Sequence, residues 1–186
     1  DSGQSYGSDQ VCVTSYGVLG DTNGDSSLNV QDIIVMINMI FELENINLQT
    51  ADLNGDEDVS ILDVIILIGM ILDNHAQDAT RASLIDNNGE VSLASDGYIG
   101  GVQMTLSHAN DFSIELTDDA LVSKYHTKNN STTLIIAAPY TDYLFTASGD
   151  YTIVDMIVAN SSDQIAVSTP SIFTLDAAYP NPFNPS

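Results

Sequence analysis

The sequence predicts an α+β protein, with a small helical region built on two acidic loops followed by an all-β sandwich. Three observations support this prediction. An acidic twelve-residue pattern occurs twice, each copy leads into an apolar segment of helical length, and the chain after Arg81 changes to short alternating segments separated by turn residues. Because internal repetition marks duplicated structural units, the first part of the chain is expected to fold as two related loop–helix units.

The repeated pattern is DTNGDSSLNVQD at residues 21–32 and DLNGDEDVSILD at residues 52–63. Both copies place Asp, Asn, Asp and Asp at loop positions 1, 3, 5 and 12. Hard cations such as Ca2+ take about six to eight oxygen ligands, which short carboxylates and amides supply as the chain wraps around the ion. Mg2+ fits less well because it requires a tighter octahedron and retains its waters. The repeat therefore predicts two Ca2+ sites.

The expected ligands follow the loop positions. In the first loop they are Asp21, Asn23, Asp25, the backbone carbonyl of Ser27, Asn29 or a water, and Asp32. In the second loop they are Asp52, Asn54, Asp56, the backbone carbonyl of Asp58, Ser60 or a water, and Asp63. The alternative is a pair of Asp/Asn turns that only cap the following helices, through Asp32 or Asp63.

Two features separate these loops from the general EF-hand pattern: position 12 is Asp in place of Glu, and only the exit helix is evident. The strings GDTNGDSSLNVQDIIVMINMI and ADLNGDEDVSILDVIILIGMI resemble the duplicated loop–helix units of the dockerin module, the calcium-dependent docking domain of cellulosome-type assemblies. The resemblance covers residues 17–74. It implies a partner-binding face at positions 10 and 11 of each loop, formed by Val30, Gln31, Ile61 and Leu62.

Position 6 of each loop departs from the usual pattern. It is generally Gly because the turn there favours a positive φ, but it is Ser26 in the first loop and Glu57 in the second. A left-handed residue other than Gly costs on the order of 1 kcal/mol. The sequence therefore predicts weakened calcium binding rather than its loss.

A helix is expected after each loop, over Val30–Phe41 and Ile61–Leu72. Both segments are apolar almost all round. Two helices packed on each other hide one apolar stripe each, so the second stripe needs another cover. Either the following domain or a partner protein is expected to provide it.

A polar hinge at residues 75–80 leads into an expected immunoglobulin-like sandwich at residues 81–176. The expected strands are Ser83–Ile85, Val91–Leu93, Tyr98–Ser107, Phe112–Leu116, Val122–Tyr125, Thr132–Ala137, Tyr151–Ala159 and Gln164–Ser168. The string GEVSLASDGYIGGVQMTLSH resembles the opening of cohesin-like sandwiches, and cohesins are the usual receptors of dockerins. This second resemblance implies that one chain carries both halves of a docking pair.

The two ends of the chain suggest secretion. Residues 1–16 begin with a Gly/Ser-rich arm, which is a candidate assembly strand, and the start at Asp1 fits a mature secreted form. AYPNPFNPS, within the expected segment 177–186, resembles the first motif of the sorting domain used by the type IX secretion system; the alternative is a linker. The implied location is extracellular or on the surface of a Gram-negative bacterium.

The charge excludes two classes of partner. The chain has 26 acidic residues against 3 Lys and Arg, for a net charge of −23. Such a chain repels nucleic acid and anionic membranes, and no apolar run is long enough to span a bilayer. The three His residues fall in unrelated turns, and no nucleophile, base and metal assemble into a catalytic pattern. The sequence therefore predicts a protein that is not an enzyme.

These observations favour a secreted calcium-binding assembly module. Its partner is expected to be a cohesin-like domain of another chain or of its own copies, and self-association through such unlike faces gives a head-to-tail fibre unless the rotation closes. Two alternatives stay open. In the first, the chain is the surface-anchoring segment of a larger secreted enzyme or adhesin; in the second, it is a carbohydrate-binding sandwich with structural calcium.

Overall fold

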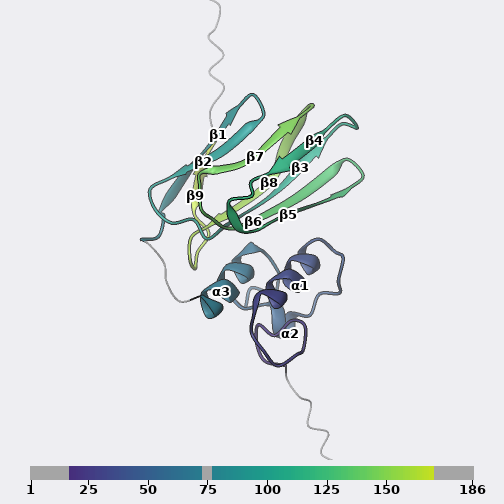
Figure 1. Cartoon of the computed structure of the whole chain (residues 1–186), viewed down its shortest axis with the longest axis vertical. Helices are drawn as coiled ribbons and strands as arrows, with labels where there is room; N and C mark the ends of the chain where they lie inside the picture. The colour runs from purple at the N-terminus through teal and green to yellow at the C-terminus, as the bar shows by residue number, and fades with distance from the viewer. Residues whose placement is uncertain (1–16, 73–76, 170–186) are drawn as a thin grey trace, which may run out of the picture.

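The computed structural model describes residues 17–72 and 77–169. Within them, a helical region packs against one face of a two-layer β-sandwich (Figure 1). The predicted α+β fold is thereby confirmed. The arm at residues 1–16, His75 in the expected hinge and the sorting motif at residues 177–186 lie outside the described residues.

The helical region contains α1 (Val30–Ile40), the short α2 (Leu48–Ala51) and α3 (Ile61–Ile71). Both long helices begin at the predicted residue, directly after an acidic loop, and end one residue earlier than predicted. Helix α2 was not predicted, since a single turn of four residues has no apolar periodicity to reveal it. Among the described residues, no helix is long and apolar enough to cross a membrane.

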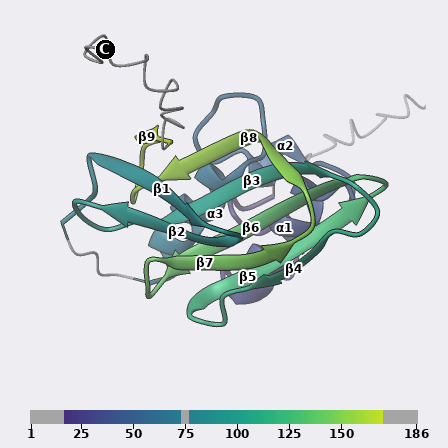
Figure 2. The ribbon, with the colours of Figure 1, turned by 90° about the horizontal axis from the view of Figure 1, so that it is seen from above.

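The sandwich consists of a five-stranded sheet in the order β4-β7-β2-β1-β9 and a four-stranded sheet in the order β5-β6-β3-β8 (Figure 2). Neighbouring strands are antiparallel except β1 and β9, which are parallel. The strands are β1 (Arg81–Asn87), β2 (Glu90–Ser95), β3 (Gly101–His108), β4 (Ser113–Leu116), β5 (Ala120–Lys128), β6 (Ser131–Pro139), β7 (Tyr143–Ser148), β8 (Tyr151–Ala159) and β9 (Ala166–Ser168).

The predicted strands are present, but the prediction missed β7. The strand is hard to recognise because Leu144 and Phe145 are buried one after the other, which breaks the alternation that marks a half-buried strand. The pairing of β2 with β7 is irregular at the same place, with a register shift between Val91 and Ser92. The third predicted strand also starts later than expected, at Gly101.

Two apolar cores hold the described residues together. One lies between the two sheets and includes the fully buried Phe145 and Leu134. The other joins α1 and α3 to the outer face of the four-stranded sheet, and it includes Ile33 and Ile65 of the helices together with Ile135 of β6. The sequence predicted that either the following domain or a partner protein covers the second apolar stripe of the helices. In the structure, the chain's own sandwich covers it.

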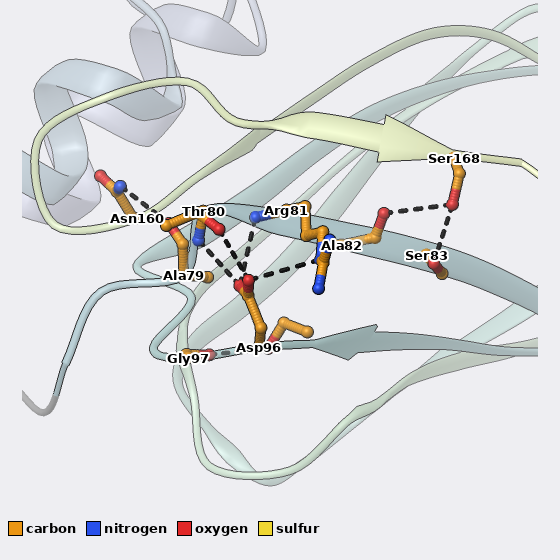
Figure 3. Close-up of polar contacts among 10 residues, drawn as sticks. Ala79, Thr80, Arg81, Ala82, Ser83, Asp96, Gly97, Asn160 and Ser168 are labelled. Atoms are coloured by element: carbon orange, nitrogen blue, oxygen red, sulfur yellow. Dashed lines mark hydrogen bonds and ion pairs between the residues drawn. The ribbon is translucent and has the colours of Figure 1, made fainter.

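A polar clamp fixes the start of the sandwich (Figure 3). The Asp96 carboxylate, at the end of β2, accepts the Thr80 hydroxyl at 2.6 Å and the Thr80 and Arg81 backbone N–H groups at 2.8 and 3.2 Å. The Arg81 guanidinium lies 3.5 Å from the same carboxylate. The hydrogen bonds from Thr80 and Arg81 lower the pKa of Asp96 to about 2. The chain thus enters β1 in a fixed position.

Candidate calcium loops and docking face

The first residue of each loop organises the turn that follows it. In the first loop, the Asp21 carboxylate accepts the backbone N–H groups of Gly24 at 2.8 Å, Asp25 at 3.1 Å and Ser26 at 2.9 Å. This side chain is buried under the turn, and three donors hold its charge there.

The second loop repeats this arrangement with one bond fewer. The Asp52 carboxylate accepts the N–H groups of Gly55 at 2.7 Å and Glu57 at 3.0 Å. The donors stand at the same loop positions, 4 and 6, as in the first copy. The duplication seen in the sequence is therefore a duplication of backbone geometry as well.

Positions 3 and 5 lie side by side in both loops. The Asn23 side-chain amide donates to the Asp25 carboxylate at 3.0 Å, and the Asn54 amide donates to the Asp56 carboxylate at 2.7 Å. The structure therefore brings together the expected ligands at these two positions, on the exposed rim of each loop.

Position 7 follows the same turn. The backbone N–H of Ser27 donates to Asp25 at 2.8 Å, and that of Asp58 donates to Asp56 at 3.0 Å. Since each N–H bonds to the carboxylate two residues earlier, the chain curls at position 7 around the side chain of position 5. The expected carbonyl ligands thus belong to the same compact turn.

Position 12 of the first loop is a fully buried carboxylate. Asp32 accepts the N–H groups of Thr22 at 3.0 Å, Asn23 at 3.2 Å and Asn29 at 2.9 Å. It therefore ties the start of the loop to the start of α1 across about ten residues of chain. A buried charge is tolerated only with such partners.

Asp63 holds the same place in the second loop. It is also fully buried, and it accepts the N–H groups of Leu53 at 2.8 Å, Asn54 at 3.2 Å and Ser60 at 2.9 Å. Burial raises the pKa of the Asp63 carboxyl, while these three hydrogen bonds oppose the rise. A nearby cation would favour the ionised form of such a group.

The position 12 carboxylates take part in the helix caps, as the capping alternative expected. Asn29 and Ser60, at position 9, are the N-caps, each accepting from the second residue of its helix. Asp32 and Asp63 stand three residues later and complete a capping box by bonding back to the cap N–H. The position 9 side chains thus bond to the first turn of the helix that follows each loop.

Position 6 has the strained backbone that its place in the loop predicts. Ser26 has φ 69° and Glu57 has φ 70°, both in the left-handed region. Gly24 and Gly55, at position 4, have φ 75° and 79°. The loops therefore keep a left-handed conformation at position 6 without glycine, at a cost in conformational energy.

The donor chemistry of both loops fits a hard cation. Each offers short carboxylates, an Asn amide oxygen and backbone carbonyls, the oxygen donors that Ca2+ prefers. In the described residues no three His, Cys, Asp or Glu side chains converge as a metal cluster. Each carboxylate instead accepts N–H groups of its own loop. The remaining expected ligands are not carboxylates but an Asn side-chain oxygen and a backbone carbonyl oxygen.

The proposed docking residues differ sharply between the two copies. Val30, at position 10 of the first loop, is 45% exposed, and Gln31 beside it is exposed. Ile61, its counterpart in the second loop, is 0% exposed, and Leu62 is partly buried. The Ile61 backbone N–H donates to the Gln103 side-chain oxygen in β3 at 3.1 Å. The second pair thus lies against the chain's own sandwich.

Two tandem loop–helix units with a shared hydrogen-bond frame define a duplicated loop–helix module. Residues 19–72 match the family model described as the Dockerin type I domain, so this part of the chain is a dockerin-type module, as its sequence predicts. No match was found among curated proteins.

A comparison of folds gave one similar solved structure, a non-cellulosomal cohesin from the hyperthermophilic archaeon Archaeoglobus fulgidus. The two chains are 13% identical with a TM-score of 0.31, and the match covers 52% of this chain and 86% of that one.

Sequence reasoning gave no role to two residues that the structure places under α3. These are Gly101 and Gln103, both on the face of β3 that meets the helix. A signal for Gly101 was present, because glycine at a strand position often marks the close approach of another element. The target of Gln103 lies 42 residues away in the sequence, and no local pattern reveals such a contact.

Proposed function

We propose that this chain is a calcium-dependent, non-catalytic assembly module of an extracellular protein. Dockerin type I domains bind calcium, dock onto cohesins and belong to extracellular proteins, and residues 19–72 match that family. The observation that carries the proposal is the contact of α3 with the outer face of the four-stranded sheet. It supports the view that the sandwich is a receptor for a dockerin-type helix.

Two Ca2+ ions are proposed, one in each loop. Asp21, Asn23, Asp25, Asp32 and the Ser27 carbonyl would hold the first, and the matching residues of the second loop would hold the other. The ion neutralises carboxylates that otherwise repel one another, and it thereby stabilises the loop and the helix that follows. The matching hydrogen bonds in the two loops support the same local role for each ion, which is to hold its own loop.

The partner face follows from the same contact. In the structure, α3 occupies the sheet of its own chain, and the same surfaces can in principle meet between copies, as in domain swapping. Exchange between unlike faces of successive copies propagates head to tail, and it forms a ring or a fibre according to whether the rotation closes. We therefore propose self-assembly by exchange of the α3 contact as the sharpest form of the function.

Sedimentation of the full chain tests this proposal. The chain is measured over a range of protein concentrations in millimolar Ca2+ and again in EGTA. Species larger than a monomer that grow with concentration in Ca2+ and disappear in EGTA support self-assembly. A monomer at every concentration in Ca2+ contradicts it, and then the α3 contact serves only to hold the two regions of one chain together.

The competing functions predict other results. An anchoring segment of a larger enzyme or adhesin stays monomeric and binds a separate surface protein. A carbohydrate-binding sandwich is retained on a column of immobilised sugar after α3 is displaced from the sheet. The proposed secretion route, which rests on the motif at residues 177–186, is tested separately by locating the full-length protein in cell fractions.

A further inference from the structure

The two halves of the dockerin-type module are not equivalent in this chain. Helix α3 packs on β3, β6 and β8, whereas the first two residues of α1, Val30 and Gln31, are exposed. The start of α3 is fully covered at Ile61, and Ile65 one turn later is 3% exposed. Only the second calcium loop therefore leads directly into the contact with the sandwich.

The sheet is shaped for this helix at one point. A Cβ atom on Gly101 would lie 2.8 Å from both Ile61 Cγ1 and Ile61 Cδ1, closer than side chains approach in proteins. Glycine at the start of β3 thus lets the Ile61 side chain rest on the backbone of the strand. Any larger residue there forces the helix away from the sheet or distorts it.

Gln103 adds a directional contact beside this glycine. The first N–H groups of a helix have no partner within the helix. The Ile61 N–H is one of them, and it donates to Gln103 Oε1 at 3.1 Å. The side chain of a sandwich residue therefore completes the N-terminus of a helix in the calcium-loop region.

A continuous set of hydrogen bonds links this contact to the second loop. Asp63 accepts from Leu53 and Asn54 near the start of the loop and from Ser60 at its end. Ser60 is the N-cap of α3 and directly precedes Ile61, which bonds to Gln103. A cation that fixes the second loop also fixes the direction of the Ile61 N–H. In the first loop, the corresponding residue, Val30, lies at the surface.

We infer that Gln103 and Gly101 form the receptor for position 10 of the second loop and couple calcium binding in that loop to docking on the sandwich, while calcium in the first loop is uncoupled from it. The inference rests on the proposed function. Coupling between two binding events is reciprocal, so docking raises the calcium affinity of the second loop by the same factor by which its calcium strengthens docking.

Calcium titration by calorimetry tests the inference on the full chain. Two parent variants keep one loop each: Asp52→Asn with Asp56→Asn leaves the first loop, and Asp21→Asn with Asp25→Asn leaves the second. Gln103→Met, which keeps the length of the side chain but removes the acceptor, is added to each parent. It is expected to weaken calcium binding about three- to tenfold in the second loop, in line with the loss of one hydrogen bond, and less than about twofold in the first.

Matched variants distinguish the effect of losing this hydrogen bond from that of a general disruption of β3. Gln103→Glu keeps an acceptor and should restore the affinity of the second loop. Ser107→Ala, at an exposed position further along the same strand, should change neither loop. Hydrogen exchange of the Ile61 amide gives a second readout, and its protection should fall in Gln103→Met but not in Ser107→Ala.

The outcomes distinguish the inference from the function on which it rests. Equal weakening of both loops by Gln103→Met, or no weakening of either, overturns the coupling while calcium binding itself stands. If neither parent variant nor the native chain binds calcium, the proposed function and the inference both fall. Gly101→Ala provides an independent check, since it should lower Ile61 protection and the calcium affinity of the second loop together.

Discussion

The two loop–helix units of this chain share a sequence pattern and a hydrogen-bond frame, yet they stand in different surroundings. Both bury a carboxylate at position 12, and both adopt a positive φ at position 6. The two units differ at position 10, where Val30 is at the surface and Ile61 lies under the sandwich. Duplication has therefore fixed the geometry of the loops, whereas tertiary packing decides what each copy can meet.

The largest expected effect concerns position 10. Ile61→Ala removes most of a fully buried side chain and leaves a cavity, so it should lower the free energy of unfolding by about 2–5 kcal/mol. Val30→Ala, its matched control at an exposed site, should stay within about 0.5 kcal/mol. Urea unfolding measures both. Equal losses at the two positions would show that the helices are not packed differently.

Position 12 should give a smaller effect, similar in both copies. Asp32→Ala and Asp63→Ala each remove a buried carboxylate to which three backbone N–H groups donate, which should cost about 1–3 kcal/mol. In the first loop the Thr22 N–H keeps a second acceptor, the Gly20 carbonyl. Urea unfolding in EGTA checks the values. A large loss in one loop with none in the other would break the symmetry that the hydrogen bonds indicate.

Substitution by glycine at position 6 should increase the stability of the protein. Ser26→Gly and Glu57→Gly relieve left-handed backbone and should raise stability by up to about 1 kcal/mol each. Gly24→Ala and Gly55→Ala are the reverse control, because an added Cβ has no atom within 4 Å and meets backbone strain alone. Thermal unfolding with and without Ca2+ measures these variants, and a loss on adding Gly would contradict the strain.

The smallest effect concerns the ion pair between Glu42, just after α1, and Lys128 at the end of β5. Their atoms are 2.6 Å apart and exposed, so the pair should add little and weaken with salt. Lys128 lowers the pKa of Glu42. Because the folded pKa lies below the unfolded one, any stabilisation is present above the ordinary pKa of Glu and is lost as the pH falls through the lowered value. Lys128→Ala should make the stability less dependent on pH in this range, as measured by unfolding at low and high salt. An unchanged dependence would assign it to other groups, such as Asp96 with its lowered pKa.

The sequence predicts the local features of this molecule well. The loop repeat, the helix starts and most strands depend on short-range patterns, and the positive φ at position 6 follows from the place of Ser26 and Glu57 in the loop. Strand β7 was missed because Leu144 and Phe145 do not alternate. The contact between Ile61 and Gln103 was missed because it depends on how two distant elements pack.

The placement of the chain's three basic residues has a consequence for proteolysis. Arg81 is the first residue of β1, and Lys124 and Lys128 lie in β5. Trypsin-like enzymes require one of these residues in an accessible, extended segment. Arg81 and Lys124 are paired with neighbouring strands, whereas Lys128 is the last residue of β5, beside the exposed turn at Asn129. Cleavage after Arg81 or Lys124 therefore requires the opening of β1 or β5 and reports local unfolding of the sandwich, whereas cleavage after Lys128 needs only the exposed turn.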